Sequence, residues 1–471
     1  MRTITKSLLC VLCTLMGITA NAGDYRVTDF GAKADGITLN TNIIQHAIDH
    51  VSSHGGGNLV FTPGRYLTGT IYLKSDVTLM LENGAELLGS TNPWDYNKSP
   101  VVNWQSLIFA FGQKNIAIRG KGTINGQGAQ TAYNQVDIIN RGLYDDALRN
   151  GRPYEGNRPQ NIYFRECDNV VVEGITVDSK SYWNNDGIDV VDCDGVVIRH
   201  CTIDAADDVF CFKSHSADHI CQNVVVEDCV GRSSANGLKF GTVSRGGFRN
   251  FKVKNLTIYN TYRSAITFAT VDGGIIDNIE VDGVRSINTG NVIFLRTGER
   301  WNKGKRPSMS NITIRNVYAE IPSFKPDAGY SYEGPVEDMP RNISPASIVG
   351  IPTCKIKNVT LQNIEIVTPG GGNPLFAYRG TTAKDLDSIP EMIKSYPEFS
   401  QFKELPAWGF YLRHAENVTF DNIVFRALKH DYRPAIVADD VKGLTLKDMQ
   451  YIEPDSKGKV QEVLYHSTRN K

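Results

Sequence analysis

The stretch CDNVVV at residues 167–172 is the first clear copy of a six-residue pattern that recurs along the chain. The other copies are CDGVVI (193–198), CQNVVV (221–226), FRNFKV (248–253), IDNIEV (276–281), MSNITI (309–314), IKNVTL (356–361), AENVTF (415–420) and VKGLTL (441–446). From 169 to 278 the Asn or Gly at the third position recurs after 26, 28, 27 and 28 residues, and the spacing drifts later. A period in this range is typical of a solenoid, in which successive coils of one chain stack on each other.

Each repeat consists of short β-branched runs separated by Asn, Asp and Gly, with no helical period long enough to fill the gap. Three short strands and their turns account for this length at about 3.3 Å per strand residue. The pattern therefore predicts an all-β fold, a parallel β-helix. We expect the recurring Asn to adopt the left-handed conformation in a turn and to bond its stacked neighbours. Gly195 and Gly443 replace it where the same backbone shape is needed.

The first 22 residues have the features of a signal peptide. Arg2 and Lys6 precede an apolar run from Leu8 to Ile18, and small residues stand before Gly23. The run is too short to span a bilayer, and no later stretch is apolar enough. We therefore expect an exported protein, periplasmic or extracellular, without membrane insertion.

An amphipathic helix is predicted just before the repeats, from Thr41 to His54. Its apolar face is formed by Ile43, Ile44, Ala47, Ile48 and Val51. A lone helix in this place usually caps the open end of a solenoid and covers the unpaired edge of its first coil.

The composition fits one elongated domain, residues 23–471. The 471-residue chain is 41% hydrophobic, so it can bury a large core. Its 50 Lys and Arg against 51 Asp and Glu give a net charge of -1, and no basic stripe is present. A nucleic-acid partner is therefore not expected. We expect the domain to act as a monomer.

Cysteines recur in register with the repeat. Seven of the nine remain beyond the predicted signal peptide, and an odd number argues against a complete disulfide framework. Cys167, Cys193 and Cys221 share one column of the repeat, while Cys201 and Cys229 share another. We interpret them as a ladder of small buried residues in preference to disulfides or metal ligands.

Two acidic stretches stand at matching points of neighbouring repeats. They are NNDGID at 184–189 and the pair Asp207 and Asp208. Because coils stack matching points side by side, the carboxylates of Asp186, Asp207 and Asp208 should share one face. Clustered carboxylates cannot all ionise cheaply, so one of them should hold a proton near neutral pH. Such a group suits general acid–base cleavage of a sugar polymer.

The structural alternative for each acid is a turn cap. A single Asp in a β-helix turn often only accepts hydrogen bonds from backbone amides. Asp189, Asp192 and Asp194 are interpreted in this way, as turn or solvent-facing residues. The order and spacing of the other three aspartates favour catalysis for them as a group.

Three insertions interrupt the repeat, at about 127–159, 321–347 and 368–408. Loops this long are usually functional or disordered. Their aromatic residues either stack on sugar rings or pack the loops onto the coils. These residues are Tyr133, Tyr144, Tyr154, Tyr330, Tyr332, Phe376, Tyr378, Phe399 and Trp408.

With these motifs the chain resembles glycoside hydrolases of family 28, the polygalacturonases and rhamnogalacturonan hydrolases. The resemblance rests on VTDFGAKADG (27–36), Arg158 with Pro159, NNDGID and the acidic pair, and it spans about Tyr25 to Tyr451. It implies a single-stranded right-handed parallel β-helix that hydrolyses α-glycosidic bonds of pectic polysaccharides or oligosaccharides.

The resemblance also implies roles for the three aspartates. Asp207 would protonate the departing glycosidic oxygen, while Asp186 and Asp208 would position and deprotonate the attacking water. The anomeric carbon would be inverted, and no metal or organic cofactor would be needed. The late insertions could close one end of the groove, as exo-acting enzymes require.

Two motifs of the family are absent. Polygalacturonases carry Gly-His-Gly after the acidic pair, where this chain has ANGLKFG (235–241), and they carry Arg-x-Lys on the next coil, where it has AITFA (265–269). Lys239 stands near the lost His and either contacts an acidic sugar or lies on a solvated strand face. The expected substrate-binding residues are Asn184, Lys213, Asn236, Lys239 and Arg263.

Two other classes of function remain open. A β-helix lyase would bind Ca²⁺ through the three aspartates and use Lys213 or Lys239 as the base of an elimination. A non-catalytic carbohydrate-binding β-helix, such as an adhesin or tail spike, would share the fold without the chemistry.

Overall fold

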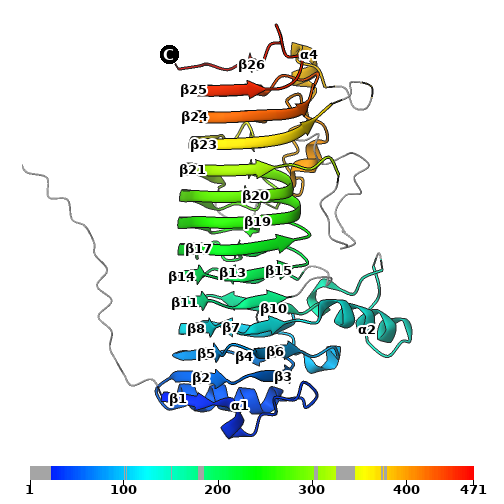
Figure 1. Ribbon diagram of the computed structural model, residues 1–471, viewed down its shortest axis with the longest axis vertical. Helices are drawn as coiled ribbons and strands as arrows, with labels where there is room; N and C mark the ends of the chain where they lie inside the picture. Colours follow the sequence, from blue (N-terminus) through cyan, green and yellow to red (C-terminus); the bar gives the residue numbers. More distant parts are fainter. Residues whose placement is uncertain are drawn as a thin grey trace, which may run out of the picture.

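The computed structural model describes residues 23–99, 101, 103–149, 151–178, 185–301, 306–324, 345–372, 375 and 379–470. They form a tall stack of coils, each paired with the coil before and after it (Figure 1). The ladders between the named strands are all parallel, as in the pairing of β10 with β13 and of β13 with β16. A right-handed winding is the one that parallel crossovers of L-amino acids favour. The predicted single-stranded right-handed parallel β-helix is confirmed.

The strands lengthen along the stack, because later coils run through their turns without a break. The early coils contain β1 (Gly23–Arg26), β2 (Gly57–Phe61), β3 (Gly64–Thr68), β4 (Ile71–Tyr72), β5 (Val77–Leu81), β6 (Ala85–Gly89), β7 (Ser106–Phe111), β8 (Lys114–Gly120) and β9 (Thr123–Asn125). The middle coils contain β10 (Gln160–Arg165), β11 (Asp168–Glu173), β12 (Thr176–Asp178), β13 (Ile188–Val191), β14 (Asp194–Arg199), β15 (Thr202–Ala205), β16 (Phe210–Ser214), β17 (Cys221–Ser233) and β18 (Leu238–Ser244). The late coils contain β19 (Gly247–Thr270), β20 (Ile275–Thr297), β21 (Ser308–Glu320), β22 (Ala346–Val349), β23 (Ile356–Gly370), β24 (Phe410–Lys429), β25 (Ile436–Ile452) and β26 (Glu462–Tyr465).

Helical segments are short and lie outside the coils. They are α1 (Thr41–Ser53), α2 (Gly128–Asn140) and α4 (Ala383–Asp387), with 3-10 turns η1 (Val27–Phe30), η2 (Pro93–Asp95), η3 (Glu155–Asn157) and η5 (Phe399–Phe402). The predicted cap is confirmed: α1 lies at the open end of the stack (Figure 1) and buries Ile44, Ala47, Ile48 and Val51. Ile43, on the edge of that face, is partly buried against the same core.

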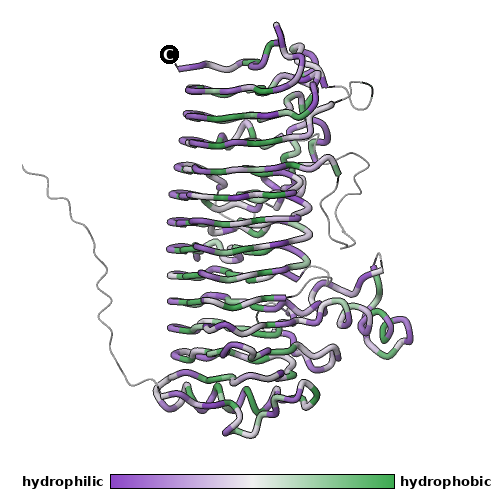
Figure 2. Tube along the Cα trace, in the orientation of Figure 1, coloured by the Kyte–Doolittle hydropathy of each residue, from purple (hydrophilic) through white to green (hydrophobic). Residues whose placement is uncertain are grey.

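The apolar positions of the repeat form continuous columns inside the stack. Val170 pairs with Val196 and Val196 with Val224 in the register of successive coils, and all three are buried. Burying one such side chain is worth about 1.5–3 kcal/mol. Figure 2 shows hydrophilic residues gathered at the edge of the stack where the turns of successive coils line up. The columns thus set the register that places every outward-facing side chain.

The recurring Asn has the predicted conformation. Asn250 and Asn278 have φ of 57° and 56°, and Gly195 and Gly443 have φ of 72° and 71° at the same place. The Asn278 side-chain amide donates to Asn250 Oδ1 in the preceding coil at 2.8 Å. Left-handed backbone and stacked amides therefore explain the repeat's most regular residue.

The seven described cysteines are all buried and unbridged, which confirms the interpretation as a ladder of small core residues. Successive members lie close together, since the Cys167 N–H donates to Cys193 Sγ at 3.5 Å. In the second column the Cys201 N–H donates to Cys229 Sγ at 3.4 Å.

The insertions differ in how they meet the stack. The first carries α2, which projects from the early coils (Figure 1). The second lies mostly outside the described residues, as do Tyr330 and Tyr332. The third, described over 368–372, 375 and 379–408, folds back onto the late coils, where Phe399 and Trp408 are core residues. Packing, rather than sugar stacking, explains these two aromatic residues; Phe376 and Tyr378 lie outside the described residues.

The predicted signal peptide, residues 1–22, also lies outside the described residues. Within the described part, none of the helices combines the length and apolar character needed to cross a membrane.

Candidate active site

Strands β13, β16 and β18 lie side by side and carry one outward-facing column. Their register aligns Asp189 with Cys211 and Cys211 with Lys239. Alternate residues of a strand face opposite sides, and their neighbours Phe212 and Phe240 belong to the core. The polar side chains of the column therefore point away from the core.

The turns that lead into these strands stack in the same way. The Gly187 N–H donates to the Asp208 carbonyl at 2.8 Å, and the Val209 N–H donates to the Asn236 carbonyl at 2.9 Å. Asp186, Asp208 and Asn236 are thereby neighbours in successive coils. The gathering of the acidic motifs expected from the repeat is present.

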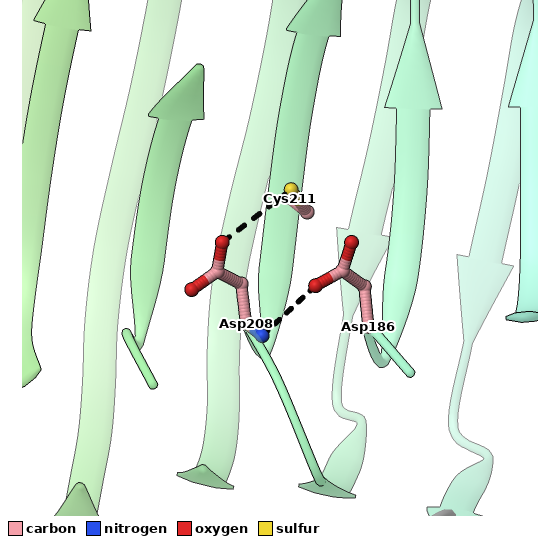
Figure 3. A group of neighbouring side chains, drawn as sticks. All are labelled: Asp186, Asp208 and Cys211. Atoms are coloured by element: carbon pink, nitrogen blue, oxygen red, sulfur yellow. Dashed lines mark hydrogen bonds between the residues drawn. The ribbon is translucent and has the colours of Figure 1, made fainter. Parts of the chain in front are cut away.

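The carboxylates of Asp186 and Asp208 are both buried and held by donors (Figure 3). Asp186 Oδ1 accepts from the Asp208 N–H at 2.9 Å, and its Oδ2 accepts from Lys213 Nζ at 2.6 Å. Asp208 Oδ1 accepts from the Asn236 N–H at 2.9 Å and from its side-chain amide at 2.7 Å. Burial raises the pKa of Asp208 and Asp186 raises it further, while Lys239 and Asn236 oppose the rise.

Asp207 has a different environment. Its side chain is partly exposed, and its carboxylate accepts no hydrogen bond from the described residues. Its backbone is fixed, because its N–H donates to the Asn185 carbonyl at 3.1 Å and its carbonyl accepts from the Ser233 hydroxyl. Partial burial and the nearby carboxylates of Asp208 and Asp186 raise the pKa of Asp207 well above the usual range. A proton on the cluster is therefore best placed on Asp207.

Lys213 joins two carboxylates. Its Nζ bonds Asp186 and also Asp189, which is completely buried. Burial alone would lower the pKa of Lys213, but Asp186 and Asp189 raise it well above the usual value, so the ammonium stays charged. The interpretation of Asp189 as a turn or solvent-facing residue is wrong, because it faces outward beneath neighbouring side chains and pairs with Lys213.

Asp192 and Asp194 follow the structural interpretation more closely. Asp192 occupies a turn with φ of 52° and accepts from the N–H groups of His215 and Ser216. It is buried rather than solvent-facing, and burial raises its pKa to about 6. Asp194, partly exposed at the start of β14, accepts from the Asn223 amide in the next coil at 2.6 Å.

Lys239 is buried beside the aspartates, with an exposed fraction of 1%. The alternative of a solvated strand face is therefore wrong. Tyr396 of the third insertion lies next to it, with 5.5 Å between Nζ and the ring centroid. The nearby Arg263 is also buried, with an ion pair to Glu398 at 2.9 Å and a hydrogen bond to the Tyr396 hydroxyl at 3.3 Å. Both cations thus meet the third insertion.

Sequence reasoning identified most of this cluster but missed several members. Asn184 lies outside the described residues, so its expected substrate contact stays a prediction. The alternation of side chains along a strand could have identified Asp189. It directly follows the inward-facing Ile188 and lies opposite Cys211. Tyr396 and Glu398 carry no such signal, since the insertion that contains them has no repeat.

A cation site was tested against the donors present. Single ligand atoms of Asp186, Asp208 and Cys211 lie within 4.8 Å of one another, and these are the residues drawn in Figure 3. Ca²⁺ takes six to eight oxygen ligands, whereas this group offers a thiol whose pKa burial raises well above its usual value. The ammonium of Lys213 also bonds Asp186 from 2.6 Å. These donors do not fit the calcium site of a lyase.

Comparison with known proteins agrees with the motifs. A family model described as "Rhamnogalacturonase A/epimerase, pectate lyase-like" matches residues 25–93. A "Probable polygalacturonase" of Vitis vinifera is 26% identical over 311 residues, covering 60% of this chain and 58% of the relative. An exo-poly-alpha-D-galacturonosidase of Dickeya chrysanthemi is 30% identical over 421 residues, covering 76% and 65%. The chain thus spans about three-fifths of the length of these two relatives.

Solved structures share the fold. The family 28 exopolygalacturonase of Yersinia enterocolitica aligns with a TM-score of 0.61 and 22% identity, covering 94% of this chain and 78% of that one. A surface adhesin of Streptococcus pneumoniae aligns with a TM-score of 0.56 and 15% identity, covering 94% and 93%. The fold alone therefore does not separate enzymes from binders.

The sequence relatives are named for polygalacturonase activity in one case and for exo-poly-alpha-D-galacturonosidase activity in the other. The resemblance to the glycoside hydrolases of family 28 is confirmed, and these relatives point to an enzyme of that class.

Proposed function

We propose that the chain hydrolyses α-glycosidic bonds in pectic polysaccharides or oligosaccharides, of galacturonan or rhamnogalacturonan type. The named activity of the relatives supports the substrate class. Export to the periplasm or the cell exterior, which residues 1–22 predict, places the enzyme where such polymers are met.

The contrast among the three aspartates carries the proposal. Asp186 and Asp208 each accept at least two hydrogen bonds, which orient their carboxylates. Asp207 accepts none from the described residues at its carboxylate and has a pKa raised by burial and by both neighbours. One protonated acid beside two oriented carboxylates is what acid–base glycoside cleavage requires.

The mechanism follows from this contrast among the three aspartates. Asp207 gives its proton to the glycosidic oxygen as the bond to the anomeric carbon breaks. Asp208 and Asp186 orient a water on the opposite face and accept its proton as the new bond forms. Because the water attacks opposite to the leaving group, the configuration inverts. Lys213 keeps Asp186 in place, and Asn236 does the same for Asp208.

Exo action is proposed from the third insertion. Phe399 and Phe402 of this insertion pack against Phe294 and Tyr411, which face outward from the same sheet further along the stack. A polymer lying along the sheet would meet this packed part of the insertion, here called the wall, beside Tyr396. Both exo-acting and endo-acting enzymes occur among the relatives, including an endo-polygalacturonase of Pectobacterium carotovorum 23% identical over 375 residues. The wall, rather than the relatives, therefore supports release of terminal units.

The lyase and the non-catalytic binder are less well supported. A lyase needs an accessible neutral base, yet Lys213 is held charged by two carboxylates, and Lys239 is buried beside Tyr396. A pure binder has no need of a raised pKa beside two oriented carboxylates.

Incubation with pectic polymers tests the proposal directly. We expect new reducing ends, first released with inverted configuration in NMR spectra, and no ultraviolet-absorbing unsaturated ends. Activity should survive a chelator. The absence of new reducing ends on galacturonan and rhamnogalacturonan alike would contradict the proposal.

A further inference from the structure

Lys239 combines deep burial with an ammonium group that has no hydrogen-bonding partner among the described residues. Its side chain points away from the core, since Leu238 and Phe240 on either side belong to that core. A buried cation without a bonded anion is costly. The position therefore calls for a reason other than folding.

Two neighbouring cations show what a structural role looks like. Arg263 and Arg300 lie 5.1 and 5.8 Å from the centroid of the same Tyr396 ring. Arg263 pairs with Glu398 at 2.9 Å, and Arg300 binds both oxygens of Asp272 at 2.8 and 2.6 Å. Each is thus neutralised by its own carboxylate. Lys239 approaches this ring in the same way but is not bonded to a carboxylate.

Lys239 acts electrostatically on Asp208, which lies in the turn before β16. Lys239 pairs in register with Cys211, whose Sγ lies 3.6 Å from Asp208 Oδ2. Asn236, three residues before Lys239, bonds the other oxygen of Asp208. The positive charge of Lys239 is also the main influence that lowers the pKa of Asp208 against burial.

We propose that Lys239 is a positioning residue that acts through Asp208. Its enclosed charge keeps Asp208 as the carboxylate, so the proton shared by the cluster stays on Asp207. The inference rests on the proposed function for the roles of the two aspartates. It differs from the direct sugar contact expected from the sequence, because the ammonium is covered and Tyr396 would have to move to admit a sugar.

The other groups that face Asp208 do not replace Lys239. Lys213 is shared between Asp186 and Asp189, and Arg263 is paired with Glu398. Among the described residues, the charged and titratable groups around Asp208 are Asp186 from the turn before β13, Asp207 from its own turn, Cys211 and Lys213 from β16, Lys239 from β18 and Arg263 from β19.

The test is the pH dependence of kcat/KM, which reports the free enzyme's acid and base. Lys239→Met keeps the length of the side chain and removes the charge. Because Asp208 then holds its proton to higher pH, the acidic limb should move upward by about one pH unit. KM should change equally for an acidic oligosaccharide and its carboxyl-reduced counterpart. Lys239→Arg should restore the limb.

Arg300→Met is the matched control, since it removes a cation from the same ring but one that Asp272 neutralises. Its acidic limb should stay at the wild-type pH. An unmoved limb in Lys239→Met would overturn the proposal. So would a loss confined to KM on the acidic substrate, which would restore the direct sugar contact.

A second measurement does not depend on catalysis. Carbon NMR titration of labelled aspartates, with Asp208→Asn for assignment, should show Asp208 titrating at higher pH in Lys239→Met. If the protein cleaved no pectic polymer but this shift occurred, the proposed function alone would fail. If the midpoint did not move, the role of Lys239 would be refuted whatever the activity. Lys239→Gln serves for both measurements if Lys239→Met does not fold.

Discussion

One outward-facing column changes character between the middle and the late coils. In the middle coils it presents Asp189, Cys211 and Lys239, and in the same register, after Thr267, it presents the aromatic Phe294 and Tyr411 with Ser347 between them. The backbone is the same in both places, since the strands are parallel and their inward neighbours are apolar. The polar part has the acidic cluster beside it, and the aromatic part is covered by the hydrophobic residues of the third insertion. The fold supplies a uniform surface, and the side chains with their covering loop decide where chemistry occurs.

The largest effect is expected from Asp207, beside the polar part. Asp207→Asn removes the transferable proton at nearly constant shape, so kcat on a pectic oligosaccharide should fall by about 10²–10⁴-fold. Near-normal turnover would show that Asp207 is not the acid.

The same variant should not lose stability. With its raised pKa, Asp207 holds a proton in the folded state more tightly than in the unfolded state. Stability therefore falls as pH rises from the usual Asp range toward the folded pKa, and a neutral Asn avoids that loss. We expect the melting temperature at neutral pH to stay level or rise.

The aromatic part of the column is tested by loosening the insertion that covers it. Phe402→Ala removes a buried ring between the insertion and the stack, which should cost about 3–5 kcal/mol in unfolding free energy. If the insertion is the wall, polymer viscosity should also fall faster for each bond cut than with wild type. Leu428→Ala, at an exposed position of β24, is the control and should change neither. A wild-type enzyme that already thins the polymer rapidly would refute the exo proposal.

The buried ion pair of Asp189 with Lys213, in the polar part, is tested by Asp189→Ala. Removing one partner of a buried pair leaves Lys213 with Asp186 alone and should cost up to about 3–5 kcal/mol. Asp168→Ala breaks the exposed pair with Lys114 and should cost less than about 1 kcal/mol. Urea unfolding of both variants gives the two values. Equal losses would mean that burial of Asp189 contributes nothing.

The smallest effect is expected at the turn ladder, which runs through both parts. Asn278→Ala puts a side chain that disfavours the left-handed region at φ of 56° and removes the bond to Asn250. The cost should be about 1 kcal/mol in thermal or urea unfolding. Asn278→Gly should cost less, because glycine adopts this backbone freely. Equal losses in the two variants would show that the amide bond, which both variants lose, matters more than the conformation.

Some of the features under test could be predicted from the sequence, and others could not. The repeat predicted the β-helix, the left-handed Asn, the capping helix and the neighbourhood of Asp186 and Asp208, because each depends on local period. It did not predict that Asp189 is buried, since its cover comes from side chains of other coils. Nor did it predict Tyr396 beside Lys239, because an insertion without period folds back according to long-range packing alone.

The insertion also changes how the molecule should unfold. In a stack of coils each coil contacts only its neighbours, so local opening can divide the stack at any weak coil. The segment from 389 to 398 contacts several coils at once. Arg296 donates to the carbonyls of Glu391 and Met392, and Arg413 donates to that of Ile389. Glu398 pairs with Arg263. One segment thereby ties β19, β20 and β24 together. The coils beside the acidic cluster should melt cooperatively with the C-terminal coils, while those nearer α1 remain free to open on their own.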